Sequence, residues 1–256
     1  MISSDDILSL APPRADARLT YGSDANQFVD LRVPKGKGPH PLAIAIHGGY
    51  WRAKYDLGYM GHMCAALTAK GIATANLEYR RVGNAGGGWP GTFADIRAGF
   101  QFLLQKARQY DFDVRRVVAL GHSAGGQLAL CLAAHEKSVK GVVSLAGVVD
   151  LQRAYELHLS NDAVVEFLGG TPVEVGDHYR EADPMKLAIA ARQRLVHGAA
   201  DDIVPPAFSR DYVAAKQKIK EDARLVEIVR AGHFEVVDPR SEAWREVEKA
   251  VVEAAG

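Results

Sequence analysis

The stretch of sequence that decides the fold is Val117–Gly126, which reads VVALGHSAGG. Its apolar first part, Val117–Leu120, is typical of a buried strand, and the apolar residues that follow the stretch are typical of a helix. Between them lies the pattern Gly-x-Ser-x-Gly, in which Gly121 and Gly125 allow the strand and the helix to approach each other closely. A serine in such a turn has a strained backbone and an exposed hydroxyl. We therefore predict that Ser123 is a nucleophile.

Strand patterns and helix patterns alternate along most of the chain. We expect eight strands, close to residues 18–21, 28–33, 42–46, 72–77, 116–120, 139–145, 194–196 and 225–229. Short apolar runs such as 42–46 suit strands that are buried on both faces. Strands that alternate with helices form parallel sheets that are covered by helices. The sequence therefore predicts an α/β fold with a mostly parallel eight-stranded sheet and helices on both faces.

The alternation breaks between residues 150 and 191, in a segment that is rich in polar residues, glycine and proline. This segment is too long for a plain crossover between two strands of one sheet. We therefore expect one domain over residues 1–256, with residues 151–190 inserted as a small cap over the carboxyl ends of the strands, where it would set substrate size. Residues 1–16, ahead of the first strand, are expected to form an arm or a short helix.

The composition indicates a soluble protein without a nucleic-acid partner. The 31 basic residues balance the 31 acidic ones, so the chain has no basic field for nucleic acid. No apolar run approaches the length of a membrane span, and the N-terminus lacks the basic start and apolar core of a signal peptide. We therefore expect a soluble, cytoplasmic protein that binds no membrane, with Cys64 and Cys131 as buried free thiols. The sequence leaves the oligomeric state open, with a homodimer as one alternative.

The chemistry at Ser123 requires further groups. A serine hydroxyl is a weak nucleophile until a neighbouring base removes its proton. Of the nine histidines, His233 is favoured as this base, because it follows a strand end and lies in a short loop before a helix. Backbone N–H groups must also face the oxyanion that forms during such a reaction. The N–H of Ala124, directly after the serine, is suited to that role at the start of the helix.

Four motifs in this chain resemble those of the α/β-hydrolase family and occur in the family's order. They are His47-Gly48-Gly49-Tyr50-Trp51, Gly121–Gly125, His197–Pro205 and Gly232-His233-Phe234. The match covers roughly residues 27–255. The His-Gly-Gly start is similar to that of the hormone-sensitive-lipase-like esterases. The longer His-Gly-Gly-Tyr-Trp most resembles the kynurenine formamidase (arylformamidase) branch, because the esterase branch usually has a third glycine where Tyr50 stands.

The resemblance implies an acid and the remaining oxyanion donors. Asp201 matches the family's acid in His-Gly-x-x-Asp-x-x-Val-Pro, with Asp202 as the alternative, and it would orient the base and stabilise its cation. The N–H groups of Gly49 and Tyr50 would complete the oxyanion hole. The resulting catalytic set is Ser123, Asp201 and His233. We expect neither a cofactor nor a metal.

Three side chains are assigned to the substrate pocket. Tyr50 and Trp51 leave their loop beside the reacting carbonyl, where aromatic rings would stack on an aromatic leaving group. The alternative is that one or both rings pack beneath the cap. His122 is the variable residue of the turn that carries Ser123, and it is assigned to the same pocket.

These residues predict a serine hydrolase that cleaves a small carboxylic ester or a related acyl bond through an acyl-enzyme. The sharper alternative is an arylformamidase that hydrolyses N-formylkynurenine. Both reactions use the same groups, so the choice between an ester and an aryl formamide depends on the cap and the pocket. A distant alternative is a non-catalytic binding protein with this fold, against which the complete catalytic set argues. For a catalyst, the expected partner is a small molecule.

Overall fold

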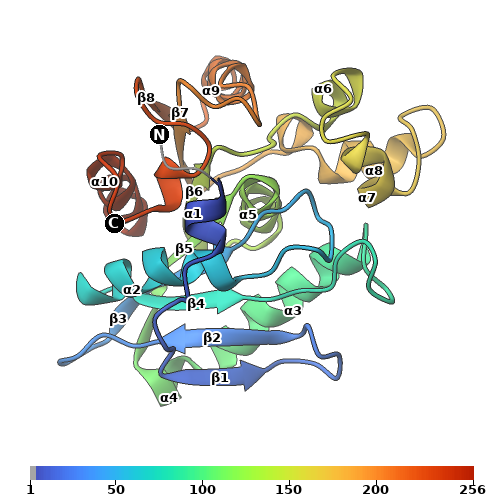
Figure 1. Cartoon of the computed structure of the whole chain (residues 1–256). Helices are drawn as coiled ribbons and strands as arrows, with labels where there is room; N and C mark the ends of the chain where they lie inside the picture. The colour runs from blue at the N-terminus through green and yellow to red at the C-terminus, as the bar shows by residue number, and fades with distance from the viewer. Residues whose placement is uncertain (1–3) are drawn as a thin grey trace.

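The computed structural model describes residues 4–256, with side chains from Asp6 onward, and contains one eight-stranded sheet (Figure 1). The strands are β1 (Ala17–Thr20), β2 (Phe28–Arg32), β3 (His40–Ile46), β4 (Ala73–Leu77), β5 (Phe112–His122), β6 (Val139–Leu145), β7 (Arg192–Gly198) and β8 (Ala223–Ile228). Their order across the sheet is β1-β2-β4-β3-β5-β6-β7-β8. The pairs β1–β2 and β2–β4 are antiparallel, and all other pairs are parallel. The predicted α/β fold with a mostly parallel sheet is confirmed.

Helices cover both faces of this sheet. One face packs against α2 (Gly61–Ala69) and α10 (Trp244–Ala255). The other face packs against α3 (Gly91–Gln105), α5 (Ala124–His135) and α9 (Ala207–Lys218). Successive side chains of a strand point to opposite faces, so Ala43 and Ala45 of β3 join the first layer while Ile44 and Ile46 join the second. None of the helices in the described part of the chain is both long and apolar enough to cross a membrane.

Shorter elements complete the described chain. They are α1 (Ser4–Leu8), η1 (Gly58–Met60), α4 (Ala107–Tyr110) and η3 (Glu235–Val237).

Cys64 on α2 and Cys131 on α5 are buried free thiols, as predicted. β5 starts at Phe112, earlier than the expected strand 116–120, because Phe112 pairs with His40 ahead of a shift in register. The residues in between are largely polar, so the apolar run alone does not reveal this part of the strand.

The turn between β5 and α5 is a point of very close backbone packing. A Cβ atom added to Gly121 would lie 1.9 Å from the carbonyl oxygen of Gly125. A Cβ atom added to Gly125 would lie 2.0 Å from the carbonyl oxygen of Ile46 at the end of β3. The two glycines therefore allow α5 to start directly against both central strands. This contact fixes Ser123 at the carboxyl edge of the sheet.

The segment between β6 and β7 packs on the loops that follow two other strands. It contains α6 (Leu151–Glu156), α7 (Ala163–Leu168), α8 (Gly176–Ala182) and η2 (Pro184–Lys186). Phe167 of α7 stacks on Trp51 with ring centroids 4.5 Å apart, and its carbonyl oxygen accepts a hydrogen bond from the N–H of Trp89. The guanidinium of Arg52 donates to the carboxylate of Glu166 at 2.7 Å. The segment thus rests on the loops after β3 and β4, at the upper right of Figure 1.

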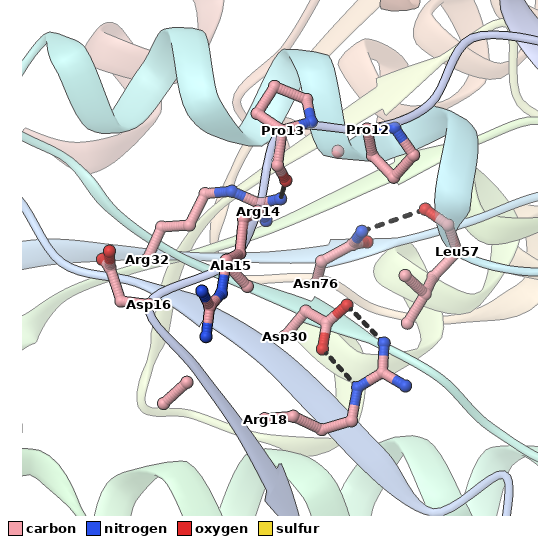
Figure 2. Close-up of a pocket in the computed structure, with 12 residues that line it drawn as sticks. Pro12, Pro13, Arg14, Ala15, Asp16, Arg18, Asp30, Arg32, Leu57 and Asn76 are labelled. Carbon is pink, nitrogen blue, oxygen red and sulfur yellow. Dashed lines mark hydrogen bonds and ion pairs between the residues drawn. The ribbon is translucent and has the colours of Figure 1, made fainter.

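The residues ahead of β1 form an arm that is fastened to β2. The expected arm over residues 1–16 is described from residue 4 onward, and residues 1–3 lie outside the described part. The guanidinium of Arg32 donates a hydrogen bond to the carbonyl oxygen of Pro13 at 2.5 Å (Figure 2). The carboxylate of Asp16 accepts one from the N–H of Val33 at 2.8 Å. A cavity of about 390 Å³ lies between the arm and strands β2 and β4, and its lining includes Pro13, Asp16 and Arg32.

Gly125→Ala should destabilise the protein severely. The added methyl group would face backbone atoms of β3, which cannot turn aside as a flexible side chain can. We expect a loss of about 3 kcal/mol or more in the free energy of unfolding, measured by chemical denaturation. The matched control is Gly176→Ala, where an added Cβ meets no atom within 4 Å, and it should stay within about 0.5 kcal/mol of the wild type. Equal stability of the two variants would contradict the packing argument.

Candidate active site

Ser123 occupies a strained turn between β5 and α5. Its φ of 56° and ψ of −121° lie in a sparsely populated backbone region, which costs a residue with a side chain roughly 1–3 kcal/mol. Its N–H donates to the carbonyl oxygen of Leu145 at 2.8 Å. Its own carbonyl oxygen accepts from the N–H groups of Gly126 and Val148 at 2.9 and 3.2 Å. These backbone bonds hold the turn in place at the carboxyl edge of the sheet.

Asp201 and His233 lie in the loops after β7 and β8 and are hydrogen-bonded to each other. The Oδ2 atom of Asp201 is 2.7 Å from Nδ1 of His233. The Oδ1 atom accepts the N–H groups of Ile203 and Val204, each at 2.9 Å. Burial raises the pKa of Asp201, but hydrogen bonds from His197 and His233 outweigh burial and hold this pKa well below its usual value. Asp201 is therefore an ionised, fixed carboxylate that orients the imidazole.

Asp201 and its neighbour in the sequence, Asp202, have different surroundings. Asp202 is exposed. His197 is buried beside Asp201, with Nε2 at 3.1 Å from Oδ2 of Asp201 and Nδ1 at 2.7 Å from the hydroxyl of Ser209. His197 therefore supports the same carboxylate oxygen that is bonded to His233. Although two histidines and a carboxylate meet here, no group of side chains within residues 4–256 is arranged to hold a metal ion.

Ser123 and His233 line the same cavity, whose volume is about 350 Å³. The other residues of its lining are Leu8, Gly49, Tyr50, Lys54, Tyr55, Tyr59, His122, Ile203 and Phe234. The structure thus brings the expected nucleophile and base to one place, with the base bonded to the expected acid. Among the described residues of the lining, none comes from 151–190. The walls come from the arm, from the turn at Ser123 and from the loops after β3, β7 and β8.

The loop after β3, whose Gly49 and Tyr50 line this cavity, has backbone N–H groups without an acceptor among the described residues. Gly49, Tyr50 and Trp51 have φ values of 103°, 51° and 57°, so the loop curls through three successive left-handed residues. No acceptor within residues 4–256 bonds the N–H groups of Gly49, Tyr50 or Ala124. Donors without an internal partner beside a serine are what an oxyanion hole requires.

A buried charged cluster anchors the start of this loop. Glu78, directly after β4, lies 3.0 Å from Nε2 of His47 and 2.8 Å from the guanidinium of Arg81. Its second oxygen accepts the N–H of Leu57 at 3.1 Å. Burial raises the pKa of Glu78, but His47 and Arg81 outweigh burial and hold this pKa below its usual value. Sequence reasoning missed Glu78, because a glutamate after a strand forms no motif until the fold brings His47 to it.

His122 lines the cavity but has no free ring nitrogen. Its side chain is buried, with Nδ1 at 2.9 Å from the hydroxyl of Tyr59 and Nε2 at 3.0 Å from the carbonyl oxygen of His233. Burial and, second, the nearby His233 hold the pKa of His122 well below its usual value. The ring is therefore neutral at physiological pH. Its assignment to the pocket agrees with its position, but both nitrogens are engaged within the protein.

The two aromatic residues of the loop have different surroundings. Tyr50 lines the cavity, and its hydroxyl donates to the carbonyl oxygen of Ile203 at 3.1 Å. Trp51 does not belong to the lining. It is 1% exposed, stacks on Phe167 and donates from Nε1 to the side-chain oxygen of Gln127 at 3.0 Å. The assignment of Trp51 to the substrate pocket is therefore corrected: the left-handed turn directs its ring beneath α7.

Known proteins with similar sequences are esterases by name. The BD-FAE family model matches residues 29–215. A probable isoprenylcysteine alpha-carbonyl methylesterase of Arabidopsis thaliana is 23% identical over 233 residues, which cover 81% of this chain and 54% of that protein. A versiconal hemiacetal acetate esterase of Dothistroma septosporum is 25% identical over 200 residues, which cover 71% and 60%. The chain therefore spans little more than half the length of these curated relatives.

Solved structures show the same fold over nearly the whole chain. A truncated carbohydrate esterase from gut microbiota has a TM-score of 0.82 at 19% identity, covering 96% of this chain and 99% of that one. An esterase of Thermogutta terrifontis with propionate bound has a TM-score of 0.75 at 21% identity, covering 94% and 93%. With the strand order described above, this likeness shows that the chain has the α/β-hydrolase fold.

Asp201→Asn should lower the free energy of unfolding at pH 7 by about 1–3 kcal/mol, because it weakens buried bonds to a charged acceptor. The folded pKa of Asp201 lies below its unfolded value of about 3.9. Its charge therefore contributes stability above that value, and this contribution disappears as the pH falls through the folded pKa. The gap between wild type and variant should be constant from about pH 7 to 5 and shrink below about pH 4.

The control for this measurement is Asp202→Asn, which alters an exposed carboxylate of the same loop. Its free energy of unfolding should stay within about 0.5 kcal/mol of the wild type at every pH. If the gap for Asp201→Asn widened as the pH fell, the direction assigned to the pKa of Asp201 would be wrong.

Proposed function

The chain belongs to the BD-FAE family, and we propose that it is a serine hydrolase that cleaves a small carboxylic ester through an acyl-enzyme. The observation that carries the proposal is the 2.7 Å bond between Asp201 and His233, beside a cavity that Ser123 also lines. An imidazole oriented by a carboxylate and placed next to a serine is the arrangement that activates a hydroxyl. The esterase names of the relatives and structural neighbours support the same type of reaction.

Each group has a defined role in this reaction. Nε2 of His233 removes the proton of Ser123 while the serine oxygen attacks the ester carbonyl carbon. Nδ1 stays bonded to Asp201, whose negative charge stabilises the imidazolium. The imidazolium then gives the proton to the departing alcohol, which leaves an acyl-serine. Water attacks the acyl group with the same histidine as base, and the histidine returns this proton to the serine oxygen as the carboxylic acid is released.

The charge that develops on the carbonyl oxygen needs donors that are already in place. We assign this role to the N–H groups of Gly49, Tyr50 and Ala124, which have no other acceptor within residues 4–256. The first two lie in the loop that starts at His47, whose ring is bonded to the buried Glu78, and the third begins α5. Donors held by the fold do not have to reorganise during the reaction, and removal of one typically costs about 10²–10³-fold in turnover.

The cavity suits a small substrate with an apolar or aromatic part. Its volume of about 350 Å³ lies near the lower end of the range of roughly 300–1,000 Å³ that is usual for ligand sites. The apolar side chains of Leu8, Ile203 and Phe234 contribute to its wall, together with the rings of Tyr50 and Tyr55. We therefore infer that short acyl groups are preferred over long ones.

An aryl formamide is the second candidate substrate. The formyl group is the smallest acyl group, and the aromatic rings of Tyr50, Tyr55 and Phe234 in the lining are able to stack on an aryl group. The same three catalytic groups serve this reaction, with an amine instead of an alcohol as the leaving group. Trp51 takes no part in either case, because its ring lies beneath α7.

The catalytic roles are tested by removing the nucleophile and the base. Ser123→Ala and His233→Ala should each lower kcat/KM by on the order of 10⁴–10⁶, and the double variant should lose little more, because the two residues act as a unit. A fluorophosphonate probe should label the wild type and not Ser123→Ala, while Asp202→Asn should keep both activity and labelling. Labelling or ester hydrolysis that survives in Ser123→Ala would overturn the proposal.

The substrate class is tested by comparing kcat/KM for p-nitrophenyl acetate, butyrate and octanoate with that for N-formylkynurenine. A confined cavity should favour the short esters over octanoate by at least about tenfold, because such pockets discriminate by roughly 1–3 kcal/mol. N-formylkynurenine should be the poorer substrate. If it exceeds every ester by tenfold or more, the aryl formamide replaces the ester as the proposed substrate.

A further inference from the structure

One chain of hydrogen bonds joins the loops around the candidate nucleophile. The N–H of Gly48 donates to the hydroxyl oxygen of Tyr59 at 2.7 Å. That hydroxyl lies 2.9 Å from Nδ1 of His122, and Nε2 of His122 lies 3.0 Å from the carbonyl oxygen of His233. The chain therefore runs from the loop after β3, through η1 and the turn at Ser123, to the loop that carries the base.

The chemistry of the end groups sets the direction of these bonds. A carbonyl oxygen can only accept, so Nε2 of His122 carries a hydrogen that it donates to His233. In the neutral ring, Nδ1 then has only a lone pair, so the hydroxyl of Tyr59 donates to it. The N–H of Gly48 can only donate, and the oxygen of Tyr59 accepts it. Every group in the chain is thus satisfied by a neutral His122 with its hydrogen on Nε2.

The surroundings of His122 favour this neutral form. The ring faces Tyr59, Phe234 and the ring of His233, whose centroid is 4.6 Å away. The charged or titratable groups that act on it are His233, Asp201 and His197. Burial has the largest effect and lowers the pKa of His122. A cation at this position would also oppose the imidazolium that forms on His233 during ester hydrolysis.

We propose that His122 and Tyr59 are positioning residues. They fix the loop that carries Gly49 and Tyr50 relative to the base, His233. The hydroxyl oxygen of Tyr59 accepts the N–H of Gly48 and so fixes the loop directly before Gly49 and Tyr50. The N–H groups of these two residues stay available for the oxyanion. His122 fixes the main chain of His233 and places an uncharged ring beside its imidazole. The kinetic consequences rest on the proposed esterase function, whereas the protonation state of His122 does not.

Tyr59→Phe is the most direct kinetic test, because it removes the hydroxyl and keeps the ring. We expect kcat for p-nitrophenyl acetate to fall about 10- to 100-fold with KM changed by less than about threefold, the pattern of a contact that matters in the transition state. The matched control is Tyr212→Phe, which removes another buried hydroxyl, bonded to Gln193 at 2.5 Å, and should leave kcat unchanged. An unchanged kcat in Tyr59→Phe, or an equal loss in Tyr212→Phe, would overturn the proposal.

Two substitutions of His122 test its two hydrogen bonds separately. His122→Gln keeps an amide N–H near the position of Nε2 and should retain part of the bond to the carbonyl of His233. His122→Phe keeps a planar ring and loses both bonds. We expect kcat to decrease in the order wild type, Gln, Phe at similar KM, even if the Phe variant is the more stable of the two. If the order of kcat follows thermal stability instead, His122 contributes only to packing, and the proposal is overturned.

Nitrogen-15 NMR of the His122 ring tests the chain without any substrate. The ring should be neutral with hydrogen on Nε2 at pH 6, where a histidine with the ordinary pKa of about 6.5 is largely cationic, and Tyr59→Phe should shift the Nδ1 resonance because a donor is lost. A cationic ring at pH 7, or hydrogen on Nδ1, would overturn the proposal even in an active esterase. The expected tautomer in a protein without esterase activity would support the hydrogen-bond chain and overturn the proposed function.

Discussion

The backbone contact between Gly121 and Gly125 is the constraint on which the rest of the site depends. It allows α5 to begin against β5, and the contact of Gly125 with Ile46 ties the same point to β3. These strands are neighbours at the centre of the sheet, so their carboxyl ends place Ser123 beside the loop that carries Gly49 and Tyr50. A side chain at either glycine would displace the start of α5. The N–H of Ala124, the proposed third oxyanion donor, would then move relative to that loop.

Buried groups of fixed charge hold the two loops that face this turn. Glu78 anchors the loop after β3, and Asp201 anchors the loop after β7. Removing a carboxylate from water costs several kcal/mol unless partners offset the loss. Both carboxylates have such partners, and in both the pKa lies below its usual value. His122 has the opposite character, because burial keeps it neutral. In the proposed reaction, the proton that His233 accepts would therefore arrive between an ionised carboxylate and a neutral ring.

The parts of the structure that follow local rules were predictable from the sequence. The eight strands appear near the expected positions, because short apolar runs between helix patterns identify buried parallel strands. Asp201 was separable from Asp202 only by resemblance, and the bond to His233 gives the physical reason. Trp51 was assigned to the pocket although its ring lies elsewhere. A tryptophan in the sequence does not indicate that its backbone is left-handed, and this conformation sets the direction of the ring. Tyr59 was missed, because its partner His122 lies 63 positions away and only the fold brings the two together.

The inserted segment and the arm differ in how they meet the cavity that Ser123 lines. The insertion was recognisable by its length and breakers, but these features do not show where it packs. Its helix α7 lies on Trp51 and Arg52, directly after the proposed oxyanion donors, and contributes nothing to the described lining of the cavity. The short arm instead contributes Leu8 to the wall, held by the bond from Arg32 to Pro13. The arm therefore borders the cavity directly. The insertion instead contacts the loop after β3, at the two residues that follow Tyr50.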